Sequence, residues 1–166
     1  VDGQSALDGA HRIAAGRGDI GIVGETVDPA AELENFPFAE IRLVLVTPLR
    51  HPLSRRRKIA FREALDREFV GFAAGSPMQD LLNYHAFRAG RRLKLRIRLN
   101  GSDLMCQMVE KGIGVAILPE TAAGRCQQSM AIQVIPLTDT WALRQLTICV
   151  RSFRSLPAHA QRLVEF

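Results

Sequence analysis

The sequence is poor in aromatic residues and cysteines, and it has no long apolar run. Only 6% of the 166 residues are aromatic, and the three cysteines are Cys106, Cys126 and Cys149. An odd number of cysteines without a CxxC pair is typical of a reducing compartment and argues against a disulfide framework or a zinc site. No apolar run approaches the roughly 18 residues of a membrane span, and no signal segment opens the sequence. We therefore expect a cytoplasmic protein without metal or membrane contact.

Two patterns that suggest nucleotide or nucleic-acid binding are incomplete. Gly112 and Gly114 close an expected helix instead of opening one, and they lack the GK[ST] ending of a phosphate-binding loop. The net charge of +5 comes with basic clusters at residues 55–58 and 91–98, but almost no aromatic residues accompany them, unlike the stacking platforms of single-strand binders. Basic and apolar residues alternate over residues 93–99, which predicts a strand with one solvated face.

No grouping typical of an enzyme stands out in the sequence. The four histidines are scattered, and no Ser/His/Asp or Cys/His set occurs at a recognisable spacing. His51 precedes a proline and is interpreted as part of a turn. We therefore expect no catalytic residue, no cofactor and no enzymatic activity.

The most informative stretch is residues 99–119, LNGSDLMCQMVEKGIGVAILP. Asn100 or Ser102 is expected to cap a helix, whose inward face would carry Leu104, Met105, Met108 and Val109. Gly112 is placed where a helix ends in the left-handed conformation. Residues 115–118 form an apolar run typical of a strand covered on both faces, ended by a proline. The stretch predicts a strand–helix–strand unit of a parallel sheet.

The rest of the chain alternates expected strands and helices, which predicts an α/β protein. Residues 73–77, AAGSP, form the clearest linker between a strand and a helix. Because the last strand and helix lack a partner in the second half, we expect them to return to the first. The prediction is two lobes with a hinge: residues 1–72 and 144–166 as lobe I, and residues 73–143 as lobe II. The further expected strands are 19–23, 41–47, 68–72, 93–99, 132–137 and 146–150, the further helices are 6–15, 62–66, 78–89, 120–124 and 158–166, and residues 28–38 are an expected loop.

Small and polar residues after two expected strands are candidates for ligand binding. Such loops let backbone amides and hydroxyls approach a small anion, particularly where a helix begins. Ser102 is explained equally well as a helix cap, and the two roles are compatible. Glu25 would meet a cationic group at a strand's carboxyl end, or is a solvated loop carboxylate. A redox role for the nearby Cys106 is left open. The candidate set is Ala73, Gly75, Ser76, Asn100, Gly101, Ser102 and Glu25.

In their order along the chain, the motifs resemble the effector-binding (substrate-binding) domain of LysR-type transcriptional regulators. The matching segments are residues 18–23 (GDIGIV), 51–53 (HPL) after a strand, 69–76, and 109–119 (VEKGIGVAILP). The resemblance implies the two-lobed fold of type II periplasmic binding proteins, with a small effector bound between the lobes. Family members often carry Thr or Ser where this chain has Ala73, so Ser76 becomes the candidate donor.

The resemblance also implies partners. The effector would be a small, carboxylate-bearing anion. The domain would form a homodimer, and the full-length regulator a tetramer that contacts DNA only through an N-terminal winged helix-turn-helix absent from this sequence. The first strand and helix of the domain are expected to be missing as well. The alternative is the solute-binding component of a transporter with the same fold.

Overall fold

The computed structural model describes residues 13, 15–24 and 33–164, which fall into two compact units. Unit 1 comprises Val1–Glu40 and Arg144–Phe166, and unit 2 comprises Ile41–Leu143. The expected helix over residues 6–15 lies almost entirely outside the described residues, and Glu25 lies outside them too.

In unit 1, the described strands are antiparallel. β1 (Gly21–Gly24) pairs with β7 (Leu143–Val150), and β7 also neighbours the long strand β2 (Glu34–Pro48). The short helix η3 (Phe153–Ser155) and α6 (Ala158–Val164) follow β7. The expected strands over residues 19–23 and 146–150 and the closing helix are thus confirmed. The buried residues that pack together here are Ile148, Val150, Leu156 and Ala160.

In unit 2, five strands follow one another in the order β4-β3-β5-β2-β6. β3 (Glu68–Phe72) and β4 (Lys94–Leu99) are parallel, and a parallel bridge from Phe69 to Val115 joins β3 to the start of β5 (Ala116–Pro119). β2 runs antiparallel to both β5 and β6 (Ile132–Pro136). The helical elements are η1 (Pro52–Arg55), α2 (Phe61–Ala64), α3 (Pro77–Arg88), α4 (Ser102–Glu110), α5 (Glu120–Gln127) and η2 (Thr140–Ala142).

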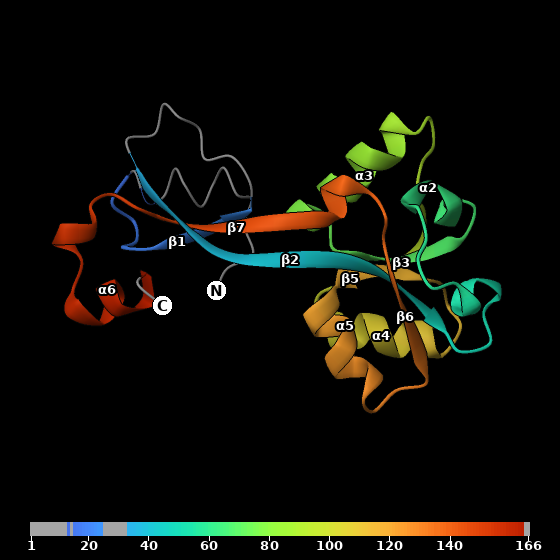
Figure 1. Cartoon of the computed structure of the whole chain (residues 1–166). Helices are drawn as coiled ribbons and strands as arrows, with labels where there is room; N and C mark the ends of the chain where they lie inside the picture. The colour runs from blue at the N-terminus through green and yellow to red at the C-terminus, as the bar shows by residue number, and fades with distance from the viewer. Residues whose placement is uncertain (1–12, 14, 25–32, 165–166) are drawn as a thin grey trace. The chain divides into compact units, whose positions relative to one another are not determined.

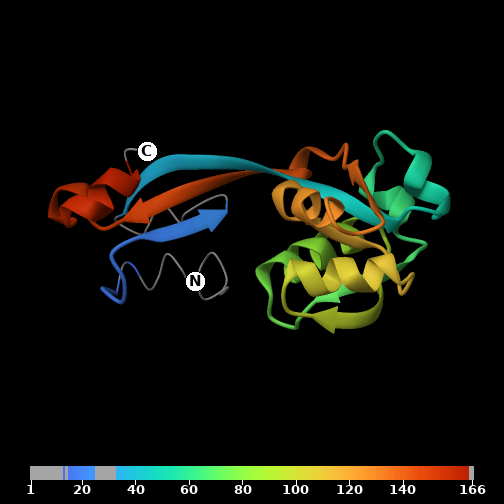
Figure 2. The same cartoon turned by 90° about the horizontal axis from the view of Figure 1, so that it is seen from below.

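Helices cover both faces of this sheet, and the strand sequences reflect it. In β2, Leu43 and Leu45 face a core shared with α2 and α3, whereas Val44 and Val46 face a core shared with α4 and α5 (Figures 1 and 2). Successive strand residues point to opposite faces, so a strand covered on both sides reads as an unbroken apolar run. β5 follows the same rule, which confirms the prediction for residues 115–118.

The structure corrects three details of the sequence prediction. The predicted loop over residues 28–38 is wrong from Glu34 onward, because β2 already begins there. Leu104 is 48% exposed, and the buried side of α4 carries Met105, Cys106 and Val109 instead. Residues 41–72 group with unit 2, not with the first part of the chain, because β2 pairs with β5 and β6, and β3 with β4.

Candidate functional site

Two neighbouring parallel strands of unit 2 end at the same edge of the sheet. Phe72, the last residue of β3, stands opposite Leu99, the last residue of β4. The amide of Ala73 donates a hydrogen bond of 3.1 Å to the carbonyl of Leu99, so the two following loops start side by side. We call residues 73–76 and 100–102 the carboxyl-end loops. Six of the seven predicted site residues lie in them, and the seventh, Glu25, lies outside the described residues.

The first carboxyl-end loop turns through Gly75, whose φ of +80° strongly favours glycine. The amide of Ser76 donates to the carbonyl of Ala73 at 3.2 Å, which closes the turn. Ser76 is then the N-cap residue of α3, with Pro77 at the first helical position. The side chain of Ser76 makes no capping hydrogen bond, so its hydroxyl remains available to a ligand.

The second carboxyl-end loop turns through Gly101, with a φ of +95°. Gly101 is the N-cap of α4, which corrects the expectation that Asn100 or Ser102 caps this helix, and the cap makes no side-chain hydrogen bond. Ser102 is half-buried in the first turn, and Asn100 is exposed. The first amides of a helix have no partner within it and carry part of the positive end of its dipole. The loop therefore presents hydrogen-bond donors next to those of the first loop.

Gln79 fixes the first carboxyl-end loop to the sheet, and sequence reasoning missed it. Its side chain is only 1% exposed. Its Oε1 accepts a hydrogen bond of 2.9 Å from the amide of Phe72, and its Nε2 donates one of 3.1 Å to Oδ1 of Asn83. A Cβ at Gly71 would lie 2.6 Å from Cδ2 of Leu95 and 2.7 Å from this Oε1, so a larger residue there would displace the Gln79 side chain. The signal was the helical spacing that puts Gln79 on the inward face with Leu82 and Ala86.

The cysteines beneath α4 are structural in character. Cys106 is fully buried, and burial followed by its hydrogen bond with Cys126 raises the pKa of the Cys106 thiol to about 12. Burial also raises the pKa of Cys126, whose Sγ donates to Oδ1 of Asp103 at 3.3 Å. Cys149 is buried as predicted, and its pKa is raised by burial. A buried, protonated thiol is a poor nucleophile.

In the part of the chain that the structure describes, no group of three or more His, Cys, Asp or Glu residues could hold a metal ion. Over the same residues, no helix is both long and apolar enough to cross a membrane.

Several curated proteins with similar sequences are named as transcriptional regulators. The chain is 24% identical over 152 residues to a probable RuBisCO transcriptional regulator from Synechocystis sp., covering 87% of this chain and 44% of that protein. It is 29% identical over 123 residues to the malonate utilization transcriptional regulator of Klebsiella pneumoniae, covering 70% of this chain and 37% of that protein. The chain thus spans about half the length, or less, of these curated relatives.

Solved structures of low sequence identity show the same fold. The regulatory domain of Synechocystis PCC6803 CcmR in complex with 2-PG superposes with a TM-score of 0.80 at 18% identity, over 97% of this chain and 77% of that one. The effector binding domain of QuiR in complex with shikimate superposes with a TM-score of 0.75 at 15% identity, over 97% of this chain and 75% of that one. The expected type II periplasmic-binding-protein-like fold is confirmed. A model of the family described as LysR substrate binding domain matches residues 5–166, and the chain therefore belongs to the LysR substrate binding domain family.

Proposed function

We propose that this chain is the ligand-sensing domain of a LysR-type transcriptional regulator and that its carboxyl-end loops bind a small anionic effector. One observation carries the proposal: two glycine-containing loops, each leading into the N-terminus of a helix, start side by side at the end of two parallel strands. The names of the curated relatives support a regulatory role over transport and over catalysis.

The chemistry of these loops suits a carboxylate. An oxyanion would be held by backbone amides at the helix N-termini and by the hydroxyls of Ser76 and Ser102, without a full countercharge. Hydrogen bonds to a charged acceptor are about twice as strong as neutral ones, so a few donors suffice. Two solved structures of the same fold carry carboxylates in their names, shikimate with QuiR and benzoate with BenM. These names support a carboxylate-bearing effector here.

In the proposed mechanism no covalent bond is made or broken. The effector shifts an equilibrium between two arrangements of the regulator by the difference in its affinity for them. We infer a homodimer of this domain, a tetramer of the full-length regulator, and DNA contact through an N-terminal winged helix-turn-helix. This chain matches 44% of the Synechocystis relative, so that protein has room for such a further domain.

A thermal-shift screen of small carboxylates, aromatic acids and amino acids, followed by calorimetry, tests the proposal. A compound present at 100 times its Kd should stabilise the chain by about 2.7 kcal/mol. For the best compound, Ser76→Ala and Ser102→Ala should each raise the Kd by roughly twelve- to 150-fold, which corresponds to the ~1.5–3 kcal/mol of one hydrogen bond to a charged group.

Ser129→Ala is the matched control, because Ser129 has an exposed side chain beyond the C-terminal end of α5. This control should leave the Kd unchanged. Equal affinity in the control and in both site variants would contradict binding by the carboxyl-end loops. Stabilisation by cationic compounds alone would contradict the anionic class of the effector.

A further inference from the structure

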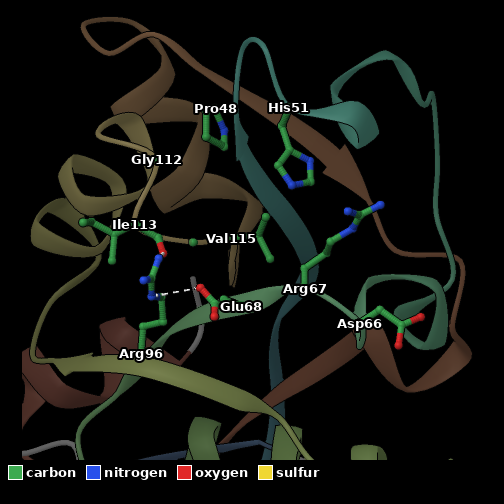
Figure 3. A pocket seen from close by; sticks show the side chains of 10 residues that line it. Pro48, His51, Asp66, Arg67, Glu68, Arg96, Gly112, Ile113 and Val115 are labelled. Atoms are coloured by element: carbon green, nitrogen blue, oxygen red, sulfur yellow. Dashed lines mark hydrogen bonds and ion pairs between the residues drawn. The ribbon is translucent and has the colours of Figure 1, made fainter.

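A polar pocket in unit 2 lies at the opposite, amino ends of the same strands (Figure 3). Its cavity of about 290 Å³ lies between the turn after β2, the beginning of β3, the middle of β4 and the turn after α4. We call it the amino-end pocket and define it by His51, Arg67, Glu68, Arg96 and residues 112–115. Nothing in the proposed effector site uses these residues.

Both acidic side chains that line this pocket are already neutralised. Nε of Arg96 lies 2.9 Å from Oε2 of Glu68, and Nη1 of Arg96 also donates to the carbonyl of Ile113 at 3.4 Å. Asp66 forms an ion pair with Arg91, which lies outside the pocket lining, and its side chain turns away from the other labelled groups (Figure 3). Neither carboxylate is therefore left to balance a further cation.

Arg67 is that further cation. Among the described residues, no carboxylate lies within ion-pair distance of its guanidinium, and its buried Nε has no hydrogen-bond acceptor. Guanidinium groups are always charged at physiological pH and present donors in a rigid fork that matches a carboxylate or phosphate. A buried donor on an unpaired cation is costly, and a bound ion is one of the ways in which proteins satisfy such a group.

His51 supplies a second donor beside Arg67. Its Nδ1 accepts a hydrogen bond of 3.1 Å from the amide of Leu53, which fixes the ring and places the ring proton on Nε2. Figure 3 shows the imidazole and the guanidinium approaching one another from two walls of the pocket. Burial and then the charge of Arg67 lower the pKa of His51.

We propose that the amino-end pocket binds a small oxyanion, a carboxylate or a phosphate, with the guanidinium of Arg67 as its main partner and Nε2 of His51 as a second donor. The cavity of about 290 Å³ is near the lower limit of ligand pockets, roughly 300 Å³, and so fits inorganic phosphate or a short dicarboxylate. Gly112 and Gly114 leave part of its wall free of side chains.

This site is separate from the carboxyl-end loops and does not rest on the proposed function. β3 runs from Glu68 at the pocket to Phe72 at the first loop, and five residues of strand span about 16 Å. α4 likewise begins in the second loop and leads to the turn at Gly112. A ligand at either end can therefore be located by which backbone amides respond to it.

Titration with inorganic phosphate and with succinate at constant ionic strength, followed by amide NMR, tests the proposal. We expect saturable shifts at Gly112, Gly114 and Arg67, with amides of residues 73–76 and 100–102 responding less. Arg67→Gln should raise the Kd at least about tenfold, because the bidentate charged contact is lost. Arg67→Lys keeps the charge without the fork and should give an intermediate Kd.

Arg62→Gln is the matched control, since it removes the same charge from the exposed face of α2. The Kd of this variant for phosphate or succinate should stay within about twofold of that of the unchanged protein. Without added anion, Arg67→Gln should melt at the same or a higher temperature, because it removes a buried donor that lacks a partner. The proposal is overturned if neither probe gives saturable shifts at Gly112 and Gly114. An equal rise in Kd for Arg67→Gln and Arg62→Gln would overturn it too, since the effect would then be a nonspecific consequence of the lost positive charge.

Discussion

The two ends of the sheet in unit 2 recruit polar groups in different ways. At the carboxyl end, the donors are backbone amides and hydroxyls in two loops, and each loop is local in sequence. At the amino end, the polar groups are side chains from positions as far apart as His51 and Arg96, which come from the turn after β2, the start of β3 and the middle of β4. One end offers partial charges from dipoles, and the other offers a full charge.

The difference in construction implies a difference in what holds each end in shape. The carboxyl end depends on a buried amide side chain, Gln79, which ties α3 to the last residue of β3. The amino end depends on backbone proximity, because the turn before β5 runs directly beside Glu68 and Phe69. Substitutions that break one end and spare the other therefore test the comparison.

Gly114→Ala should have the largest effect, because it breaks the amino end. A Cβ at Gly114 would lie 2.6 Å from the backbone carbonyl oxygen of Glu68, a contact that no side-chain rotation can relieve. The same carbonyl accepts the amide of Val115 at 2.9 Å, and the amide of Val70 donates to the carbonyl of Val115 at 2.8 Å. We expect a loss of about 3 kcal/mol in the free energy of unfolding, measured in urea.

Gly124→Ala is the control for this substitution. Gly124 lies within α5, and its Cβ would meet nothing within 4 Å. Alanine in a helix interior is favoured over glycine by about 0.5–1 kcal/mol, so this variant should be slightly stabilised. If Gly114→Ala were tolerated as well as Gly124→Ala, the close approach of the turn to β3 would be wrong.

Gln79→Leu should have the next largest effect, confined to the carboxyl end. It leaves the partly buried amide of Phe72 without its acceptor, and an unmade hydrogen bond of this kind costs about 1–3 kcal/mol. Asn83→Ala leaves Nε2 of the buried Gln79 without its acceptor and should cost a similar amount, about 1–3 kcal/mol, but it keeps the hydrogen bond to the amide of Phe72. Amide hydrogen exchange at Phe72 and Ala73 should accelerate in the first variant only. Equal exchange in both would show that Gln79 does not anchor the loop.

Most of the fold could be predicted because its signals are local. The unit over residues 99–119 combines a strand end, a helix, Gly112 with a φ of +77° and a buried strand, as expected. The predicted strand begins at residue 41, several residues after the true start of β2 at Glu34. The first half of β2 is largely exposed and lacks the apolar run of residues 43–46. The grouping of residues 41–72 depends on which strands pair, and pairing between distant segments has no signature in one segment's sequence.

The positions of the candidate binding loops could also be predicted from local signals, whereas contacts between distant residues could not. Both carboxyl-end loops were found because glycines and serines between a strand and a helix are a local signal. Gln79 was missed because its partner, the amide of Phe72, is a backbone group that carries no side-chain signature. The amino-end pocket was missed because His51, Arg67 and Arg96 each read alone as turn or surface residues. Their proximity depends on how the turn after β2, the start of β3 and the middle of β4 pack together.

The smallest expected effect concerns pH and the amino end. Burial, and then the charge of Arg67, hold the pKa of His51 below its ordinary 6.5 in the folded protein. Below pH 6.5 the unfolded chain therefore binds a proton that the folded chain does not bind. The free energy of unfolding consequently decreases as the pH is lowered from 6.5 to the lowered pKa of His51. Asp66, Glu68 and Arg96 also line the pocket, but each carboxylate is already paired.

His51→Asn should flatten this part of the stability curve, measured as the melting temperature between pH 7.5 and 5.5. Asparagine keeps a side-chain acceptor for the amide of Leu53 and so preserves the cap of η1, while it removes the titrating group. Arg67→Gln should flatten the curve only in part, because it removes the second cause and leaves burial in place. An unchanged slope in His51→Asn would mean that the pKa of His51 is not lowered in the folded protein. If instead His51→Asn flattens the curve and Arg67→Gln does not change it, the charge of Arg67 does not act on His51, and the contrast between dipoles at one end and a free charge at the other would fail.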